Sequence, residues 1–358
     1  MEKTTTALET PLREQLDRLA AFEAVDAPVL SLYLDMQADD QGQRRYDTFL
    51  RRAWLERRQT LKDDARTSFD RDTERINEYL GNVPKSVNGL AVFACTAADE
   101  FFEAVQLDAP LDHNWLFVGS VPHLYPLARL NDQYPRYAAL LLDTNSARLF
   151  VFTLGRAEIT EQVNNVKTRR HSMGGSSQAR YQRHIENFHL HHMKEVVEVL
   201  DRVVREESIN QIVVACDEVA RPLLMEQLPK HLSEKIVDVL KLDINTPGQQ
   251  VLAETMEALR EKDAETDAAK VEAMLGGWRG NGLGVAGRED TLKALEMGQV
   301  EELLITSQNL EQMKDKEVAQ VNDLVTKAQQ SAARIRFVED PALLADVGGV
   351  GALLRFKI

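Results

Sequence analysis

The chain has 358 residues, of which 44% are hydrophobic and 28% charged, and its formal net charge is −14. This length predicts two or three domains, and the composition is that of a globular protein. No stretch has the apolar character of a signal peptide or a membrane span, so we expect a cytoplasmic protein without membrane contact. The acidity argues against a protein that coats nucleic acid, because phosphates repel an acidic body. An acidic net charge is still compatible with RNA binding through one local basic segment.

Residues 1–130 predict an α+β domain. A short amphipathic helix at 11–24 precedes a strand at 29–35, and a long, highly charged helical region follows at 44–79. Further strands are predicted at 89–95, 101–107 and 115–120. Cys95 and Cys216 both lie in apolar, strand-like runs, which indicates buried thiols in a reducing compartment. A linker-like break at 131–136 would end this domain.

Residues 131–245 and 246–358 predict two further domains. The second domain opens with a β-hairpin at 138–155, and its later strands alternate with helices, which favours a mixed or parallel sheet. Pro247 is placed to start the first helix of the third domain. Helices and strands alternate to the end of that domain and predict an αβα sandwich.

A basic segment stands out within the second domain. From Lys167 to Lys194 the chain has six Lys and Arg against one acid, Glu186, and it has five of the eight histidines. A helix is predicted from about Ser177, with one apolar face and one polar, basic face. A basic loop at the tip of such a helix suits a phosphate backbone, although it could also be a solvated surface. The candidate RNA-binding residues are Lys167, Arg169, Arg170, Arg180, Arg183, His184, His191 and Lys194.

Three other kinds of site have weaker support. The glycines of Gly282–Gly287 spell a dinucleotide fingerprint, but a helix and not a strand is predicted before them. His184 and His191 share a helical face, but no HExxH motif or nearby cysteine completes a metal site. Ser176 does not lie in the GxSxG turn of a hydrolase. We therefore expect no cofactor and no bound metal.

Three motifs carry a resemblance to a known family. GREDTLKALEMGQVEELLITSQNL at 287–310 and FVEDPALLADVGGVGALLRF at 337–356 are similar to the C-terminal domain of the eukaryotic and archaeal class-1 peptide chain release factors and of the ribosome-rescue factor Pelota. GGSSQARYQRHIENFHLHHMKEV at 174–196 resembles the segment in which release factors carry Gly-Gly-Gln, then arginines and a long helix. The chain thus looks like a divergent, bacterial-type member of this family.

The resemblance implies a fold and a set of partners. It implies three domains: a mixed-sheet N-terminal domain at the decoding centre, a ribonuclease-H-like middle domain, and an αβα C-terminal domain that docks partners. The protein would occupy the ribosomal A site in the manner of a tRNA, contacting rRNA there and at the peptidyl-transferase centre. Peptidyl-tRNA and a translational GTPase such as elongation factor Tu are further candidate partners.

The resemblance leaves the activity open. Gly174 and Gly175 fit the family loop, but Ser176 stands where the family has glutamine, and Gln178 lies two residues later. These four residues are the catalytic candidates. The Asn-Ile-Lys-Ser loop that reads stop codons is missing from the first domain, which argues against codon-specific termination. We favour a non-catalytic A-site factor in ribosome rescue, stalling or hibernation. The alternatives are a peptidyl-tRNA hydrolase and a protein-interaction scaffold that no longer acts on ribosomes.

Overall fold

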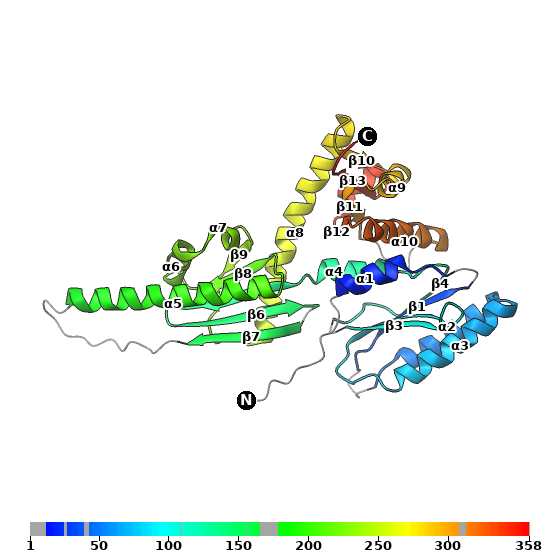
Figure 1. Ribbon diagram of the computed structural model, residues 1–358, viewed down its shortest axis with the longest axis horizontal. Helices are drawn as coiled ribbons and strands as arrows, with labels where there is room; N and C mark the ends of the chain where they lie inside the picture. The colour runs from blue at the N-terminus through cyan, green and yellow to red at the C-terminus, as the bar shows by residue number, and fades with distance from the viewer. Residues whose placement is uncertain are drawn as a thin grey trace. The chain divides into compact units, whose positions relative to one another are not determined.

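The protein is a mixed α/β chain with three separate sheets (Figure 1). The computed structural model describes residues 12–24, 27–38, 43–107, 109–154, 156–164, 178–307 and 313–357. Contacts divide the chain into two compact units, Met1–Gln133 with Asp267–Ile358, and Tyr134–Thr266. Two sheets lie in the first unit and one in the second, so the α/β and α+β fold class is confirmed, whereas the three domain boundaries remain predictions. Within the described ranges, no helix is long and apolar enough to cross a membrane.

The N-terminal sheet is antiparallel, in the order β3-β2-β1-β4. Its strands are β1 (Val29–Asp35), β2 (Gly89–Cys95), β3 (Phe101–Leu107) and β4 (Trp115–Gly119). Helices α2 (Tyr46–Thr60) and α3 (Asp63–Leu80) bury apolar side chains against one face. On the other side lie α1 (Leu12–Ala21) and α4 (Tyr125–Gln133) (Figure 1). Cys95 is buried, as is Cys216 in the middle unit, which confirms the predicted buried thiols.

Two predictions for this part of the chain need correction. The helical region at 44–79 is two helices, because Leu61 and Lys62 both have extended backbone angles, with ψ of 150° and 155°. The segment read as a linker begins inside α4, which continues to Gln133. Polar residues at 131–133 resemble a linker in sequence, but Asp132 accepts a hydrogen bond from the backbone N–H of Phe337 at 2.8 Å. This contact holds the polar end of α4 against β12.

The middle sheet has the order β7-β6-β5-β8-β9. It consists of β5 (Tyr137–Leu142), β6 (Ser146–Thr153), β7 (Arg156–Asn164), β8 (Ile212–Cys216) and β9 (Ile236–Leu240). β8 is parallel to both β5 and β9, while β5, β6 and β7 run antiparallel, so the predicted hairpin and mixed sheet are confirmed. β7 was not predicted, because an edge strand rich in charged and polar residues lacks an apolar run.

Helices cover both faces of the middle sheet. The long helix α5 (Gln178–Glu206) packs on one face, near α6 (Ala220–Gln227) and α7 (Lys230–Ser233). The first half of α8 (Gly248–Arg279) packs on the other face through Val251, Met256 and Leu259. Each sheet residue of β5 and β8 therefore faces an apolar layer, which explains why these strands are continuous hydrophobic runs.

The C-terminal sheet confirms the predicted αβα sandwich. Its order is β10-β13-β11-β12, with β10 (Gly284–Ala286), β11 (Val300–Thr306), β12 (Arg334–Val338) and β13 (Val350–Leu354). The second half of α8 and the 3₁₀ helix η2 (Pro341–Val347) share one core, and α9 (Arg288–Glu296) and α10 (Asp315–Gln330) contact the sheet as well. β10 passes so close to α8 that a Cβ on Gly284 would lie 2.1 Å from the Met274 carbonyl oxygen. Gly284 thus allows a close contact between this strand and the helix.

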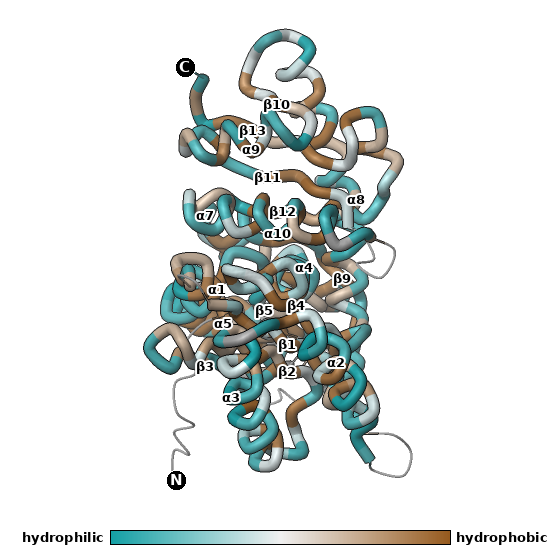
Figure 2. Tube along the Cα trace, turned by 90° about the vertical axis from the view of Figure 1, so that its right-hand side faces the viewer, coloured by the Kyte–Doolittle hydropathy of each residue, from teal (hydrophilic) through white to brown (hydrophobic). Residues whose placement is uncertain are grey.

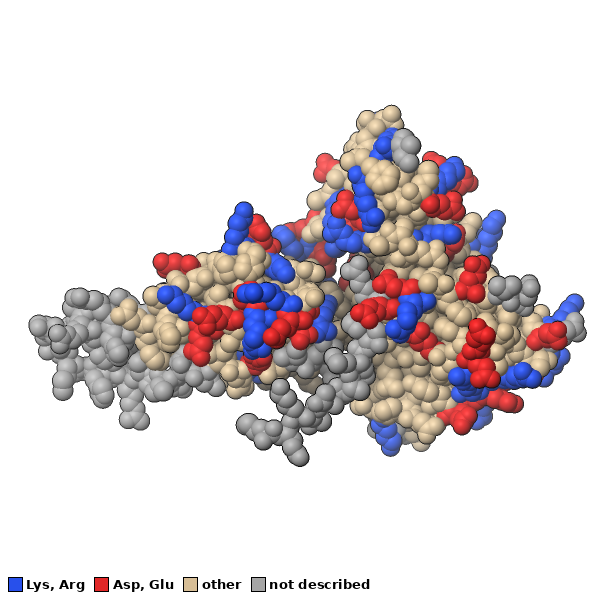
Figure 3. All heavy atoms as spheres, in the orientation of Figure 1, with Lys and Arg blue, Asp and Glu red and all other residues tan. Residues whose placement is uncertain are grey.

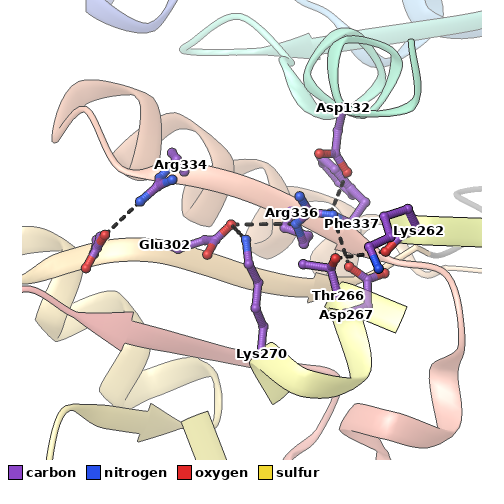
Figure 4. Close-up of polar contacts among 10 residues, drawn as sticks. Asp132, Lys262, Thr266, Asp267, Lys270, Glu302, Arg334, Arg336 and Phe337 are labelled. Atoms are coloured by element: carbon purple, nitrogen blue, oxygen red, sulfur yellow. Dashed lines mark hydrogen bonds and ion pairs between the residues drawn. The ribbon is translucent and has the colours of Figure 1, made fainter. Parts of the chain in front are cut away.

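Buried ion pairs join α8 to the strands of this sheet (Figure 4). Arg336 on β12 contacts Asp267 on α8, with 3.2 Å between Nη1 and Oδ1. Lys270, one turn along α8, lies 2.5 Å from Glu302 on β11. Shifting α8 along the sheet would separate these pairs and leave a charge buried without its partner, which is energetically costly. The ion pairs therefore fix the register of α8 on the sheet.

In the first compact unit, residues from the N-terminal part of the chain contact elements of the C-terminal part. Asn322 on α10 accepts a hydrogen bond from the N–H of Leu124 at 2.6 Å and donates one to the carbonyl of Pro122 at 3.1 Å. The rings of Tyr125 and Phe337 meet edge to face at 5.2 Å. Segments about 200 residues apart in sequence are thereby held in one compact unit.

The mutation Phe337→Ala tests this packing. Phe337 is 3% exposed, so truncation removes a buried ring and leaves a cavity. We expect the free energy of unfolding to fall by about 3–5 kcal/mol in urea titration. Phe356→Ala is the matched control, because Phe356 is 47% exposed. Equal losses for the two variants would contradict the assignment of Phe337 to the core.

A buried histidine should make the stability of this unit depend on pH. His123 stacks on Phe117 with 3.6 Å between ring centroids, and burial lowers the pKa of His123 to about 3. Below pH 6.5 the unfolded chain takes up a proton that the folded chain does not, so stability falls as the pH falls. We expect this loss to reach about 1.4 kcal/mol per pH unit.

Unfolding titrations between pH 7 and pH 5 measure this effect. His123→Leu should flatten the dependence, whereas the control His113→Leu, at an exposed position, should keep the wild-type slope. A His123→Leu variant with an unchanged slope would show that His123 is protonated in the folded state.

Candidate functional site

The basic segment connects strand β7 to helix α5. β7 ends at Asn164 and α5 begins at Gln178. The loop between them lies outside the described residues, and so do Lys167, Arg169, Arg170, Gly174, Gly175 and Ser176. Gln178, Arg180, Arg183 and His184 lie in the helical backbone of α5, and their side chains are outside the description. Their roles remain predictions.

The predicted two faces of α5 are present where its side chains are described. Met193, Val196, Leu200 and Val203 are buried against β5, β6 and β8. Asn187, His191 and Lys194 are exposed on the opposite face. The basic and polar residues at 191 and 194 therefore face away from the core, which leaves them accessible to a partner.

The first half of α5 extends beyond the sheet (Figure 1). Among the described side chains of this helix, the first buried one is His192, and residues 187–191 are exposed or half-buried. At 1.5 Å per residue, the backbone from 178 to 191 is about 20 Å long. The first half of α5 thus forms a helical arm, and the basic loop directly precedes it in the sequence.

His192 lies where this arm meets the sheet. Its ring is buried beside the β5–β6 turn and makes a hydrogen bond with the backbone of Ser146. In that turn the Asp143 carboxylate accepts hydrogen bonds from the N–H groups of Asn145 and Ser146, both at 2.7 Å. Burial lowers the pKa of His192, against the opposing effect of Ser146 and nearby acids. A neutral imidazole therefore anchors the helix at this point.

A second contact fixes α5 along the edge strand. Arg202 pairs with Glu161 of β7 at 2.6 Å and with Glu206 at 3.2 Å. These groups are partly exposed, so the pairs add orientation more than stability. The arm is therefore held by its apolar face and aligned by this pair.

The three histidines of the basic segment whose side chains are described do not form one cluster. His191 is exposed, His189 is half-buried and His192 is buried, so their rings lie on different sides of α5. Within the part of the chain that the structure describes, no group of three His, Cys, Asp or Glu could hold a metal ion.

A second basic surface, which was not predicted, lies on the N-terminal domain. Residues 44–62 carry seven Lys and Arg against two acids, Asp47 and Glu56. The sequence predicts one highly charged helical region at 44–79, and over that whole region the acids of α3 offset the positive charge of α2. A charge count for each helix separately would have found it.

Comparison with known proteins adds two family matches. Residues 122–260 match a family model described as bacterial archaeo-eukaryotic release factor family 10. Residues 269–358 match the model of eRF1 domain 3. Together the two models cover more than half of the chain, including the middle sheet, α5 and the C-terminal sheet.

Individual relatives are more distant. The chain is 27% identical over 236 residues to peptide chain release factor subunit 1 of Aeropyrum pernix. The matched region covers 61% of this chain and 60% of that protein. It is 22% identical over 328 residues to the protein of the same name from Methanopyrus kandleri, covering 87% and 78%. The first match therefore spans about three fifths of its relative.

Solved structures resemble the chain only loosely as whole molecules. The crystal structure of the archaeal translation termination factor aRF1 covers 96% of this chain and 97% of its own at 20% identity, with a TM-score of 0.29. Dom34 of S. cerevisiae, described as a translation termination-like factor, covers 75% and 79% at 12% identity, with a TM-score of 0.44.

Proposed function

Because this chain is a divergent bacterial member of the peptide chain release factor and Pelota family, we propose that it is a translation factor that binds the ribosome. Within that role, we propose that it occupies the A site and directs the basic loop of the middle domain at the peptidyl-transferase centre. The observation that carries this proposal is helix α5, whose first half extends beyond the sheet and follows directly in sequence on the basic loop of an otherwise acidic chain. Such a charge distribution favours binding to RNA in one orientation.

We favour occupancy of the site over hydrolysis of peptidyl-tRNA. A hydrolytic loop must hold water against the ester with near-attack geometry, and small displacements cost much of the rate. Ser176 is shorter than the glutamine of the family loop, and Gln178 is already the first residue of α5. Using Gln178 instead would require the start of the helix to shift. A non-catalytic role in ribosome rescue, stalling or hibernation is therefore the better supported one.

The C-terminal domain is the proposed docking site for a delivery partner. The match to eRF1 domain 3 over residues 269–358 supports this role, and a translational GTPase such as elongation factor Tu is the candidate. A scaffold without ribosome binding is the remaining alternative. The concentration of positive charge between Lys167 and Lys194 speaks against it, because a scaffold does not require such a segment.

Neutralising the basic loop tests ribosome binding. We expect the combined change of Arg169, Arg170, Arg180 and Arg183 to alanine to weaken sedimentation with ribosomes. Each lost phosphate contact should lower the slope of log affinity against log salt by about 0.7–0.9.

The control removes four exposed basic residues from the same unit, Arg221, Lys230, Lys241 and Arg260, and should leave the slope near the wild-type value. Equal sedimentation of wild type and loop variant at every salt concentration would mean that the basic loop is only a solvated surface.

Peptide release separates occupancy from catalysis. We expect wild-type protein to bind ribosomes carrying peptidyl-tRNA without releasing peptide beyond the background rate. Ser176→Gln should raise release, since it restores the family residue in a loop that otherwise fits. The readout is release of labelled peptide from defined ribosome complexes. Rapid release by wild type that Gln178→Ala abolishes would identify the protein as a peptidyl-tRNA hydrolase instead.

A further inference from the structure

We propose that the exposed face of helix α2 is a second RNA-binding surface, which contacts the phosphate backbone of ribosomal RNA. This inference rests on the proposed function, and it places a ribosome contact on the N-terminal domain as well. It starts from the charge of residues 44–62, seven Lys and Arg against two acids in a chain of net charge −14.

The packing of α2 decides which of these cations face solvent. Leu50 and Ala53 are buried against the N-terminal sheet, and Trp54 meets Phe69 of α3 edge to face at 5.9 Å. Arg44 is excluded, because its guanidinium donates to the carbonyls of Met36, Pro84 and Val87. The exposed basic residues are Arg45, Arg51, Arg52, Arg58 and Lys62.

These five residues together make up what we call the basic face of α2. Arg51 and Arg58 are seven residues apart, so they lie on one side of the helix at a spacing of about 10 Å. Arg45 and Arg52 repeat that spacing on the adjoining side. Lys62 lies between the end of α2 and the start of α3. Figure 3 shows blue Lys and Arg spheres next to red Asp and Glu spheres around the ends of these two helices. Several phosphates of one RNA strand or groove could be contacted at once.

Three cations of this face, Arg51, Arg52 and Lys62, carry charge that is available for a partner. Arg52 pairs with Glu56 at 2.7 Å, but the two side chains are 80% and 60% exposed, so the pair contributes little and can be exchanged for a phosphate. Arg58 donates two hydrogen bonds to the carboxylate of Asp70 on α3, at 2.7 and 2.9 Å, so its charge is already engaged. Neither Arg51 nor Lys62 forms an ion pair with any residue that the structure describes. The adjacent helix α3 offers a contrast, since its acids outnumber its bases.

Two observations favour RNA over an acidic protein surface. Four of the five exposed cations are arginines, whose planar guanidinium groups bind phosphate through two parallel hydrogen bonds. The arginines also follow α2 for about 20 Å, from 45 to 58, and Lys62 lies beyond its end. A repeating polyanion supplies charges over that whole length, whereas an acidic protein patch must happen to match it.

Neutralising this face should change ribosome binding in a defined way. The test variant combines Arg51→Gln, Arg52→Gln and Lys62→Gln, all at exposed positions, so the fold is retained. We expect the slope of log affinity against log salt to fall by about 0.7–0.9 for each lost phosphate contact, hence by about 2.1–2.7 for the triple variant. The control Arg66→Gln, Arg71→Gln and Lys85→Gln makes the same charge change in the same domain and should keep the wild-type slope.

Failure of this inference can be told apart from failure of the proposed function. Wild-type protein that does not sediment with ribosomes would overturn both. Wild-type binding with an unchanged slope for the α2 variant would overturn the inference alone.

A photo-crosslinker identifies the partner of this face. Leu55 lies between the basic residues and is 59% exposed, so benzoylphenylalanine in its place should be tolerated. Irradiation of the ribosome complex should link the protein covalently to RNA. Ribonuclease should shorten the RNA part of this adduct, and protease should leave a peptide attached to the RNA. The same crosslinker at Asn77, an exposed residue of α3, should give little RNA adduct. An adduct of position 55 with a ribosomal protein, or none at all, would refute RNA binding by α2.

Discussion

Burial of one face of α5 on the middle sheet is the interaction on which the proposed site depends. Met193, Val196, Leu200 and Val203 are almost fully enclosed, and each buried aliphatic side chain stabilises the packed state by about 1.5–3 kcal/mol. Helix formation is costly to nucleate but easy to extend. The packed half therefore nucleates a helix that continues into the half beyond the sheet. The arm needs no core of its own.

Helix α8 also packs differently along its length. Its first half contributes Val251 and Leu259 to the core of the middle sheet, and its second half contributes Val271 and Met274 to a core of the C-terminal sheet. One helix thus needs apolar residues on different sides along its length, which weakens any single amphipathic pattern. The buried ion pairs of Lys270 and Asp267 replace that pattern as the element that fixes the register of its second half.

Much of the fold could be predicted from local sequence patterns. The buried strands β5, β8 and β11 are apolar runs, and the visible part of α5 has the expected two faces. Features decided by tertiary contacts could not be predicted: β7 pairs through its backbone, and the end of α4 is fixed by the contact of Asp132 with β12. For the site, sequence located the basic segment but overlooked α2, because its positive charge becomes distinct only once α2 and α3 are separate helices.

The most direct test of the account is to locate the arm on the ribosome. Because Cys95 and Cys216 are both buried, a cysteine introduced at the exposed position Asn187 can be labelled selectively with iron–EDTA. Hydroxyl radicals generated there should cleave large-subunit rRNA around the peptidyl-transferase centre. The same label at Lys230, an exposed residue of α7, should not produce those cuts. Identical cleavage from both positions, or no cleavage from position 187 on a ribosome that has bound the protein, would contradict the account.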